Sequence, residues 1–110
     1  MLKRENRIRS KKEFAEIKEK GRIKYSPLFG YLVANDESSD KKFAVIVSKK
    51  ISKKAVDRNQ IRRRITEVLK KEWNNIPEGT RGVFLTKKEI LGKSLKDIER
   101  EIVKILNSKF

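Results

Sequence analysis

Hydrophobic residues in the middle of the chain recur at the spacing of one helix face. Ile61, Ile65, Val68 and Leu69 stand at positions i, i+4, i+7 and i+8, and Trp73 extends the edge of this stripe as a core residue. The pattern predicts a helix packed on a core. Residues that end helices follow it directly: Asn74, Asn75, Pro77 and Gly79.

A first helix is predicted near the N-terminus. Ser10 and Glu13 have the S-x-x-E spacing of a capping box, in which each side chain satisfies a backbone N–H group at a helix start. We expect a helix over roughly residues 10–20 that ends when Gly21 takes the left-handed conformation. The side chains expected to face inward are Phe14, Ala15 and Ile17.

β-Branched and aromatic residues dominate residues 22–34, interrupted by Pro27 and Gly30. This predicts either one bent strand or two short strands. Residues 35–40 are polar and turn-forming, and an apolar run resumes over residues 43–48. We therefore expect an antiparallel hairpin between the segments on either side of this turn.

The last third of the chain repeats the change from strand to helix. Residues 82–86 form a short apolar run, which predicts a strand. Apolar residues at helical spacing then continue to the C-terminus: Leu91, Leu95, Ile98, Ile102, Ile105 and Leu106. The order of elements predicts a layered α/β sandwich, and 110 residues are enough for one such domain.

Charge narrows the class of partner. The chain has 30 Lys and Arg against 15 Asp and Glu, a formal net charge of +15, which favours a polyanionic partner such as nucleic acid. It has no Cys and no His, which excludes disulfides, thiolate metal sites and imidazole bases. No apolar run is long enough to span a membrane or to form a secretory signal, so we expect a cytoplasmic protein without membrane contact.

The basic residues are concentrated in two blocks. Between residues 49 and 64 lie eight basic residues and one acidic residue, Asp57, and residues 1–12 hold six basic residues against Glu5. Residues 1–9 are expected to form a basic arm that is mobile or loosely docked. Solvation of an outer helix face would explain an ordinary basic run, but two dense blocks favour RNA binding.

Arg58 differs from its basic neighbours in its place on the predicted helix. Steps of about 100° per residue put Arg62 and Arg63 off the apolar stripe but place Arg58 close to it. Its side chain must then emerge beyond the end of the sheet or find a buried partner. A guanidinium held beside the N–H groups of a helix start would suit phosphate.

Part of the basic block resembles a known family. Val47-Ser48-Lys49-Lys50, followed by Ala55-Val56-Asp57-Arg58-Asn59-Gln60-Ile61-Arg62-Arg63, is similar to the signature of the bacterial ribonuclease P protein. Gln60 and Thr66 depart from it where a basic residue is common, Ser52 replaces a frequent Gly, and Arg64 stands at a usually apolar position. The basic N-terminus and the order of elements also agree with the family.

The resemblance implies a fold and a function. The fold would be α+β, a single-domain α/β sandwich of order αβββαβα, ribosomal-protein-S5-domain-2-like, with a left-handed βαβ crossover that handedness rules alone would not predict. Residues 1–110 would be one RNA-binding domain. The protein would be the accessory subunit of a ribonucleoprotein endoribonuclease. It would help the catalytic RNA remove the 5′ leader from precursor tRNA and broaden the range of substrates.

The resemblance also implies sites and partners. Residues implied to bind the RNA subunit are Lys49, Lys50, Lys53, Lys54, Arg58, Asn59, Arg62 and Arg63. Those implied or suggested for the leader are Phe14, Lys18, Phe29 and Tyr31, although core packing explains Phe14 and Phe29 equally well. Magnesium would be held mainly by the RNA subunit and the substrate. No catalytic residue, protein-held metal or protein partner is expected in this chain.

Two other functions remain open from the residues alone. Charge supports a small ribosomal or RNA-chaperone-like protein as well, and only the ordered signature separates the two. A protein-only nuclease would have to use carboxylates, and Asp36, Glu37 and Asp40 could in principle hold magnesium. The neighbouring Ser and Asn residues favour a solvated turn instead.

Overall fold

The computed structural model describes residues 2–107 and has the predicted order of elements, αβββαβα. Three short 3-10 helices lie between or before the main elements, at Arg4–Asn6, Trp73–Asn75 and Lys88–Ile90. The main elements are α1 (Lys11–Lys20), β1 (Arg22–Tyr25), β2 (Phe29–Asn35), β3 (Lys42–Ile46), α2 (Ala55–Lys71), β4 (Thr80–Thr86) and α3 (Leu95–Asn107).

The four strands form one sheet in the order β1-β2-β4-β3. β2 pairs antiparallel with β1 and with β4, whereas β3 pairs parallel with β4. The hairpin predicted between residues 22–34 and 43–48 is therefore wrong, because β4 lies between β2 and β3. The hairpin that does form joins β1 to β2, where the N–H group of Ser26 donates to the main-chain oxygen of Phe29 at 2.9 Å.

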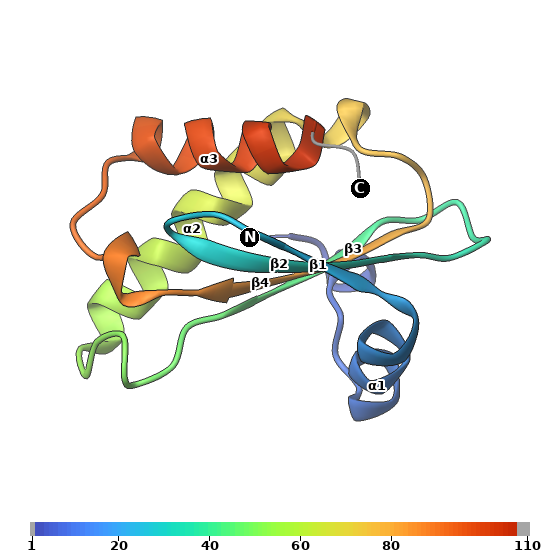
Figure 1. Ribbon diagram of the computed structural model, residues 1–110, viewed down its shortest axis with the longest axis horizontal. Helices are drawn as coiled ribbons and strands as arrows, with labels where there is room; N and C mark the ends of the chain where they lie inside the picture. Colours follow the sequence, from blue (N-terminus) through green and yellow to red (C-terminus); the bar gives the residue numbers. More distant parts are fainter. Residues whose placement is uncertain (1, 108–110) are drawn as a thin grey trace.

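The sheet has a different cover on each face (Figure 1). Helices α2 and α3 lie over one face, and the predicted stripe of α2 is buried against it. Aromatic rings from β2 and β4 pack at the centre, with ring centroids 4.7 Å apart for Tyr31 and Phe84 and 5.2 Å for Phe29 and Phe84. Trp73 packs at the edge of this core against Phe43. These contacts form the larger hydrophobic cluster.

Helix α1 covers part of the opposite face. Ser10 caps it as predicted, accepting a hydrogen bond from the backbone N–H of Glu13 at 3.1 Å. Ile17 is buried and Phe14 half-buried in a smaller cluster that includes Val83, but Ala15 is exposed, contrary to expectation. The helix leaves part of this face open, where Ile23, Tyr25 and Ile46 remain exposed.

Gly21 ends α1 for a different reason from the one predicted. Its φ is −84° and its ψ 169°, which is extended rather than left-handed backbone. A Cβ atom there would collide with the main-chain oxygen of Ile17 and stand 2.9 Å from that of Val33. Glycine is needed at this position because helix α1 and strand β2 approach it closely.

The N-terminal segment, expected to be mobile or loosely docked, is docked on the sheet over residues 2–9. The backbone N–H of Ile8 donates to the main-chain oxygen of Phe43 at 3.0 Å, and the Asn6 side chain donates to that of Lys41 at 2.9 Å. Leu2 and Ile8 are buried and act as anchors between the basic residues. Met1 lies outside the described residues.

The C-terminal helix is shorter at its start than its apolar pattern suggested. Leu91 caps the 3-10 helix Lys88–Ile90, and it packs on the core although it lies outside α3. The predicted continuation beyond Asn107 lies outside the described residues. Within residues 2–107, no helix combines the length and apolarity that a membrane span requires.

Candidate nucleic-acid interface

The loop that joins β3 to α2, residues 47–54, presents the first part of the basic block. Its lysines all have exposed side chains, whereas Ile51 is buried and anchors the loop to the core. Ser52 shapes the turn into α2: its hydroxyl accepts from the N–H of Lys54 at 3.2 Å and donates to Asp57 at 2.9 Å. The exposed lysines are Lys49, Lys50, Lys53 and Lys54. We call this segment the basic loop.

Arg58 finds the partner that its position on α2 requires. It is half-buried, and its Nη1 donates to the main-chain oxygen of Ser52 at 2.8 Å. The guanidinium is thus held against the basic loop at the first turn of α2. Asn59 and Arg63 are exposed on the outer side of the helix, and Asn59 accepts from Arg62 Nη1 at 3.3 Å.

Arg62 also lines a groove between the N-terminal segment, α1 and β3. Thr66, a departure from the family signature, is buried in the same groove. The groove is also lined by side chains from the N-terminal segment, α1 and β3, among them Arg7, Arg9, Phe14 and Ile46. We call this the α1 groove. Basic residues from the two blocks, far apart in sequence, thus line the same groove as the half-buried ring of Phe14.

Arg64, which stands at a usually apolar position of the signature, is hydrogen-bonded outside the basic loop. Its Nη1 donates to the main-chain oxygen of Lys93 at 2.5 Å, in the connection that leads into α3. The residue therefore ties α2 to the start of α3.

Two of the predicted leader-binding residues are not available to RNA. Phe29 and Tyr31 are 0% and 2% exposed, because alternate residues of β2 point into the core beneath α2 and α3. Burial also raises the pKa of the Tyr31 hydroxyl. Phe14 remains accessible at the α1 groove, and Lys18 is exposed on α1.

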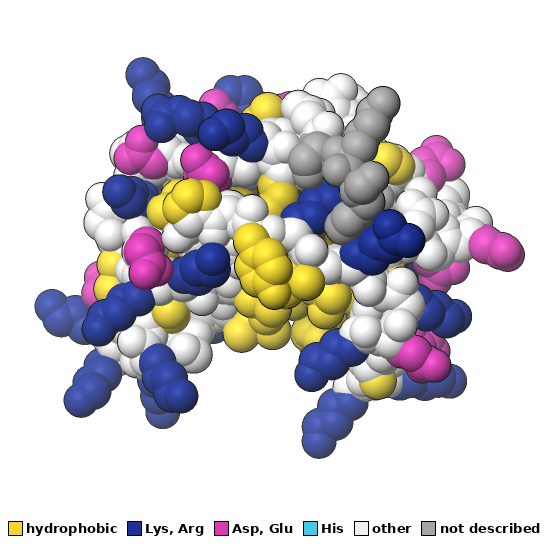
Figure 2. Space-filling model, in the orientation of Figure 1, with side chains coloured by type: hydrophobic (Ala, Val, Ile, Leu, Met, Phe, Trp, Pro, Cys, Tyr) yellow, Lys and Arg dark blue, Asp and Glu magenta, His cyan; other side chains and the backbone are white. Residues whose placement is uncertain are grey.

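Hydrophobic residues that the sequence analysis did not single out are exposed on the open face of the sheet. Ile23, Tyr25 and Ile46 are 42%, 72% and 41% exposed. Figure 2 shows a hydrophobic patch on the underside of the molecule between two groups of Lys and Arg side chains. Apolar side chains flanked by basic ones are typical of surfaces that bind single-stranded RNA.

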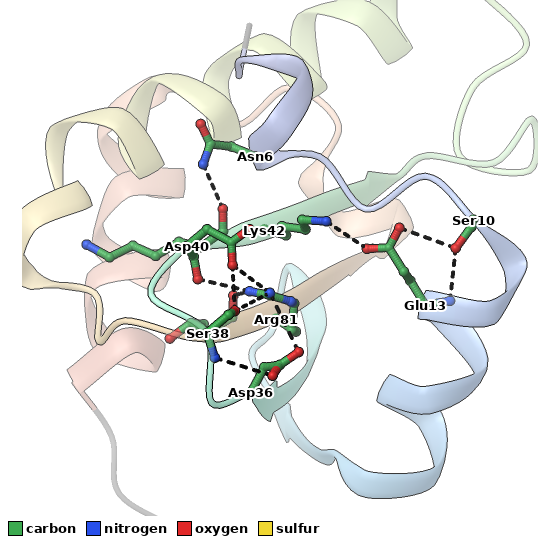
Figure 3. A network of polar contacts seen from close by, with 10 residues as sticks. Asn6, Ser10, Glu13, Asp36, Ser38, Asp40, Lys42 and Arg81 are labelled. Atoms are coloured by element: carbon green, nitrogen blue, oxygen red, sulfur yellow. Dashed lines mark hydrogen bonds and ion pairs between the residues drawn. The ribbon is translucent and has the colours of Figure 1, made fainter.

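The acidic turn 36–40 is held by Arg81 (Figure 3). Arg81 Nη2 lies 2.7 Å from Asp40 Oδ1 and 3.7 Å from Asp36 Oδ2, and it donates to the Ser38 hydroxyl at 2.7 Å. Hydrogen bonds from Ser38 and then from Arg81 lower the pKa of Asp40. Among residues 2–107, no three acidic, His or Cys side chains converge as metal ligands. The turn is a polar network of the fold.

A second ion pair links α1 to β3. Lys42 Nζ lies 3.4 Å from Glu13 Oε2, and the Ser10 hydroxyl donates to Glu13 Oε1 at 3.2 Å. Burial acts to raise the pKa of Glu13, but the charge of Lys42 and these hydrogen bonds outweigh it and leave the pKa below its ordinary value. This pair joins α1 to the end of the sheet that is remote from the basic loop.

Comparison with known proteins assigns this arrangement to one group. The family model described as Ribonuclease P matches residues 2–109. A "Ribonuclease P protein component" from Nitratiruptor sp. is 32% identical over 99 residues, covering 90% of this chain and 87% of the relative. The protein of the same name from Synechococcus sp. is 26% identical over 110 residues, covering 96% and 83%.

Solved structures show the same fold. A Staphylococcus aureus RNase P protein, a mutant described as having defective mRNA degradation activity, superposes with a TM-score of 0.84 at 24% identity, over 92% of this chain and 85% of that one. The RNase P protein from Thermotoga maritima superposes with a TM-score of 0.82 at 20% identity, over 91% and 94%. These likenesses support the single α+β domain.

Proposed function

This chain belongs to the ribonuclease P protein family, and on that premise we propose that it is the protein subunit that helps a catalytic RNA remove the 5′ leader from precursor tRNA. The observation that carries the proposal is the position of the family signature. Its arginines lie at the first turns of α2, where they meet both the basic loop and the α1 groove. One surface can therefore contact the RNA subunit and the substrate together.

The basic loop and the first turns of α2 are proposed to bind the RNA subunit. The exposed lysines neutralise phosphates, and each contact releases counterions, so binding weakens steeply as salt rises. Arg58 and Asn59 are placed at the helix start, where backbone N–H groups also favour phosphate. Arg63 extends the same charged surface along the outer side of the helix.

The α1 groove is proposed to bind the single-stranded leader. Phe14 offers a ring on which a base can stack, which contributes about 1–3 kcal/mol per base and tolerates any base. Arg62, which the resemblance implied for the RNA subunit, lines this groove, and we assign it with Lys18 on α1 to the leader phosphates. Binding of this kind suits a subunit that handles many leaders, and it broadens the range of substrates.

The chemistry of hydrolysis is assigned to the RNA. Magnesium ions held mainly by the RNA subunit and the substrate would activate the attacking water and leave a 5′-phosphate on mature tRNA. Asp36 and Asp40, two of the three carboxylates that could in principle hold magnesium, are both engaged by Arg81. The protein neutralises RNA phosphates, binds the leader and orients the substrate. We expect it to act in the cytoplasm.

The test is 5′ processing of precursor tRNA by a bacterial catalytic RNA at low magnesium, with and without this protein. We expect stimulation, together with tighter binding of leader-bearing substrate. A matched reaction with protein, magnesium and substrate but no RNA subunit is the control. Cleavage in that control would point to a protein-only nuclease. Tight RNA binding without stimulation would point to a general RNA-binding protein of the ribosomal or chaperone kind.

A further inference from the structure

Four residues form a row that crosses the open face of the sheet. Tyr25 pairs with Gly30, Gly30 with Leu85, and Leu85 with Ile46, one residue from each strand. Residues paired in register point to the same side of a sheet, so these positions share the face on which α1 lies. We call them the exposed row.

Helix α1 covers the sheet beside the exposed row but leaves its two ends open. The neighbouring row contains Val83, which is 1% exposed and packs with Ile17 of α1. At the ends of the exposed row, Tyr25 and Ile46 are 72% and 41% exposed. Ile46 also lines the α1 groove, so the row continues the proposed leader site across the sheet to its far edge.

Gly30 explains how the Tyr25 ring is supported. A Cβ atom at Gly30 would stand 4.0 Å from Tyr25 Cδ1 and 3.5 Å from Ile23 Cδ1, so both side chains lean over the glycine. An aromatic ring packed on a strand glycine is a common way to support that strand. Support of the strand alone, however, does not account for a ring that remains largely open to solvent.

A fixed positive charge lies over the same ring. Lys87 Nζ lies 5.5 Å from the centroid of the Tyr25 ring and donates to the main-chain oxygen of Ser26 at 2.8 Å. The backbone N–H of Lys87 also donates to the main-chain oxygen of Leu28 at 2.9 Å. Lysine and tyrosine are therefore held together at the end of the β1–β2 hairpin.

The geometry points to Tyr25 as a second stacking position for the leader, with Lys87 beside the phosphate of the stacked nucleotide. This inference rests on the proposed function. The supported ring offers a base its open side, and the charge of Lys87 complements the RNA backbone. Three strand spacings separate Tyr25 from Ile46, about 14 Å. The base on Tyr25 therefore belongs to a nucleotide beyond those that occupy the α1 groove.

The experiment uses the complex of this protein with a bacterial catalytic RNA and a series of precursor tRNAs whose leaders lengthen one nucleotide at a time. Wild-type affinity should rise in two stages, as the leader reaches the α1 groove and then Tyr25. Tyr25→Ala should remove only the second stage, with a loss of about fivefold to a hundredfold in Kd for long leaders. Tyr25→Phe should retain it.

An abasic nucleotide moved along the long leader identifies the stacked base. At one position the abasic substitution and Tyr25→Ala should cause losses that do not add, because each removes the same contact. The matched control is Leu95→Ala, which removes a 40% exposed apolar side chain from α3 in the opposite layer. Equal melting temperatures of the variants show that the fold is kept.

Three outcomes separate this inference from the function on which it rests. If wild-type affinity does not depend on the leader, the proposed function itself fails. If wild-type affinity rises with leader length and the affinity of Tyr25→Ala equals it at every length, only the assignment of Tyr25 is overturned. An equal loss for long leaders and for mature tRNA would also overturn it, because stacking on a distal nucleotide cannot affect a substrate that lacks that nucleotide.

Discussion

Arg58 and Ser52 are joined by a hydrogen bond of 2.8 Å from the guanidinium to a main-chain oxygen. The bond fastens the first turn of α2 to the basic loop that precedes it. It also keeps the charge of Arg58 near the helix start, where the unpaired N–H groups already favour an anion. Arg58 therefore has two functions, since it holds the loop and offers charge to RNA.

Arg58→Ala should weaken assembly with the RNA subunit about tenfold or more, because a hydrogen bond to a charged group contributes about 1.5–3 kcal/mol. The slope of log Kd against log salt should also fall by about one, the change expected for one lost phosphate contact. Binding titrations of the catalytic RNA over a range of salt measure both. Arg100→Ala, an exposed arginine on α3, is the control. Unchanged affinity and slope in Arg58→Ala would remove this residue from the interface.

Phe14→Ala should weaken the binding of leader-bearing precursor tRNA by about 1–3 kcal/mol relative to the binding of mature tRNA. Only the precursor has leader bases that can stack in the α1 groove. Phe14 also packs in the cluster with Val83, so some stability should be lost. Phe14→Leu keeps most of that packing and separates the two effects. Equal losses for both substrates would show that Phe14 is a core residue only.

Phe29→Ala should lower the free energy of unfolding by about 3–5 kcal/mol, because it empties a fully buried site between the sheet and its two helices. Urea unfolding measures this change. Phe29→Leu should lower the free energy of unfolding less than Phe29→Ala, since leucine fills more of the volume of the phenylalanine. Under conditions that keep each variant folded, the preference for leader-bearing substrate should match the wild type. A selective loss of leader binding in Phe29→Ala would show that Phe29 belongs to the leader-binding site.

Acid should destabilise the fold through Asp40 and Glu13. The pKa of each is lowered in the folded protein from ordinary values of 3.8 and 4.5. Their stabilising contribution is therefore complete above those values and is lost as pH falls through the lower folded values. Both pairs are partly exposed, so each should contribute only about 0.5 kcal/mol.

The measurement is urea unfolding at a series of pH values for wild type and for Asp40→Asn. The variant should be slightly less stable near neutral pH and should lose less stability in acid. Glu37→Gln, on the same exposed turn, is the matched control. Identical acid dependence in wild type and Asp40→Asn would mean that the hydrogen bonds from Ser38 and Arg81 to Asp40 contribute nothing measurable.

The strand partners and buried faces show where prediction from the sequence reached its limit. Phe29 and Tyr31 alternate with Gly30 and Leu32, and both sets are compatible with burial, so the pattern did not say which set faces the helices. Period-two alternation identifies the two faces of a strand but not what covers them, so it does not distinguish the buried Phe29 and Tyr31 from the exposed Tyr25. The turn at residues 35–40 likewise suggested a hairpin between β2 and β3, but β4 lies between these two strands.

The sequence by itself determined the features that depend on near neighbours: the cap at Ser10, the stripe of α2, the order of elements and the signature around Arg58. Helical period, capping and charge act over a few residues and can be read directly. Only the tertiary structure decided that β4 separates β2 from β3, that the N-terminal segment docks beside Phe43, and that Tyr25 stays open. These features depend on which distant segments pair and which face remains uncovered, and no local pattern specifies that choice.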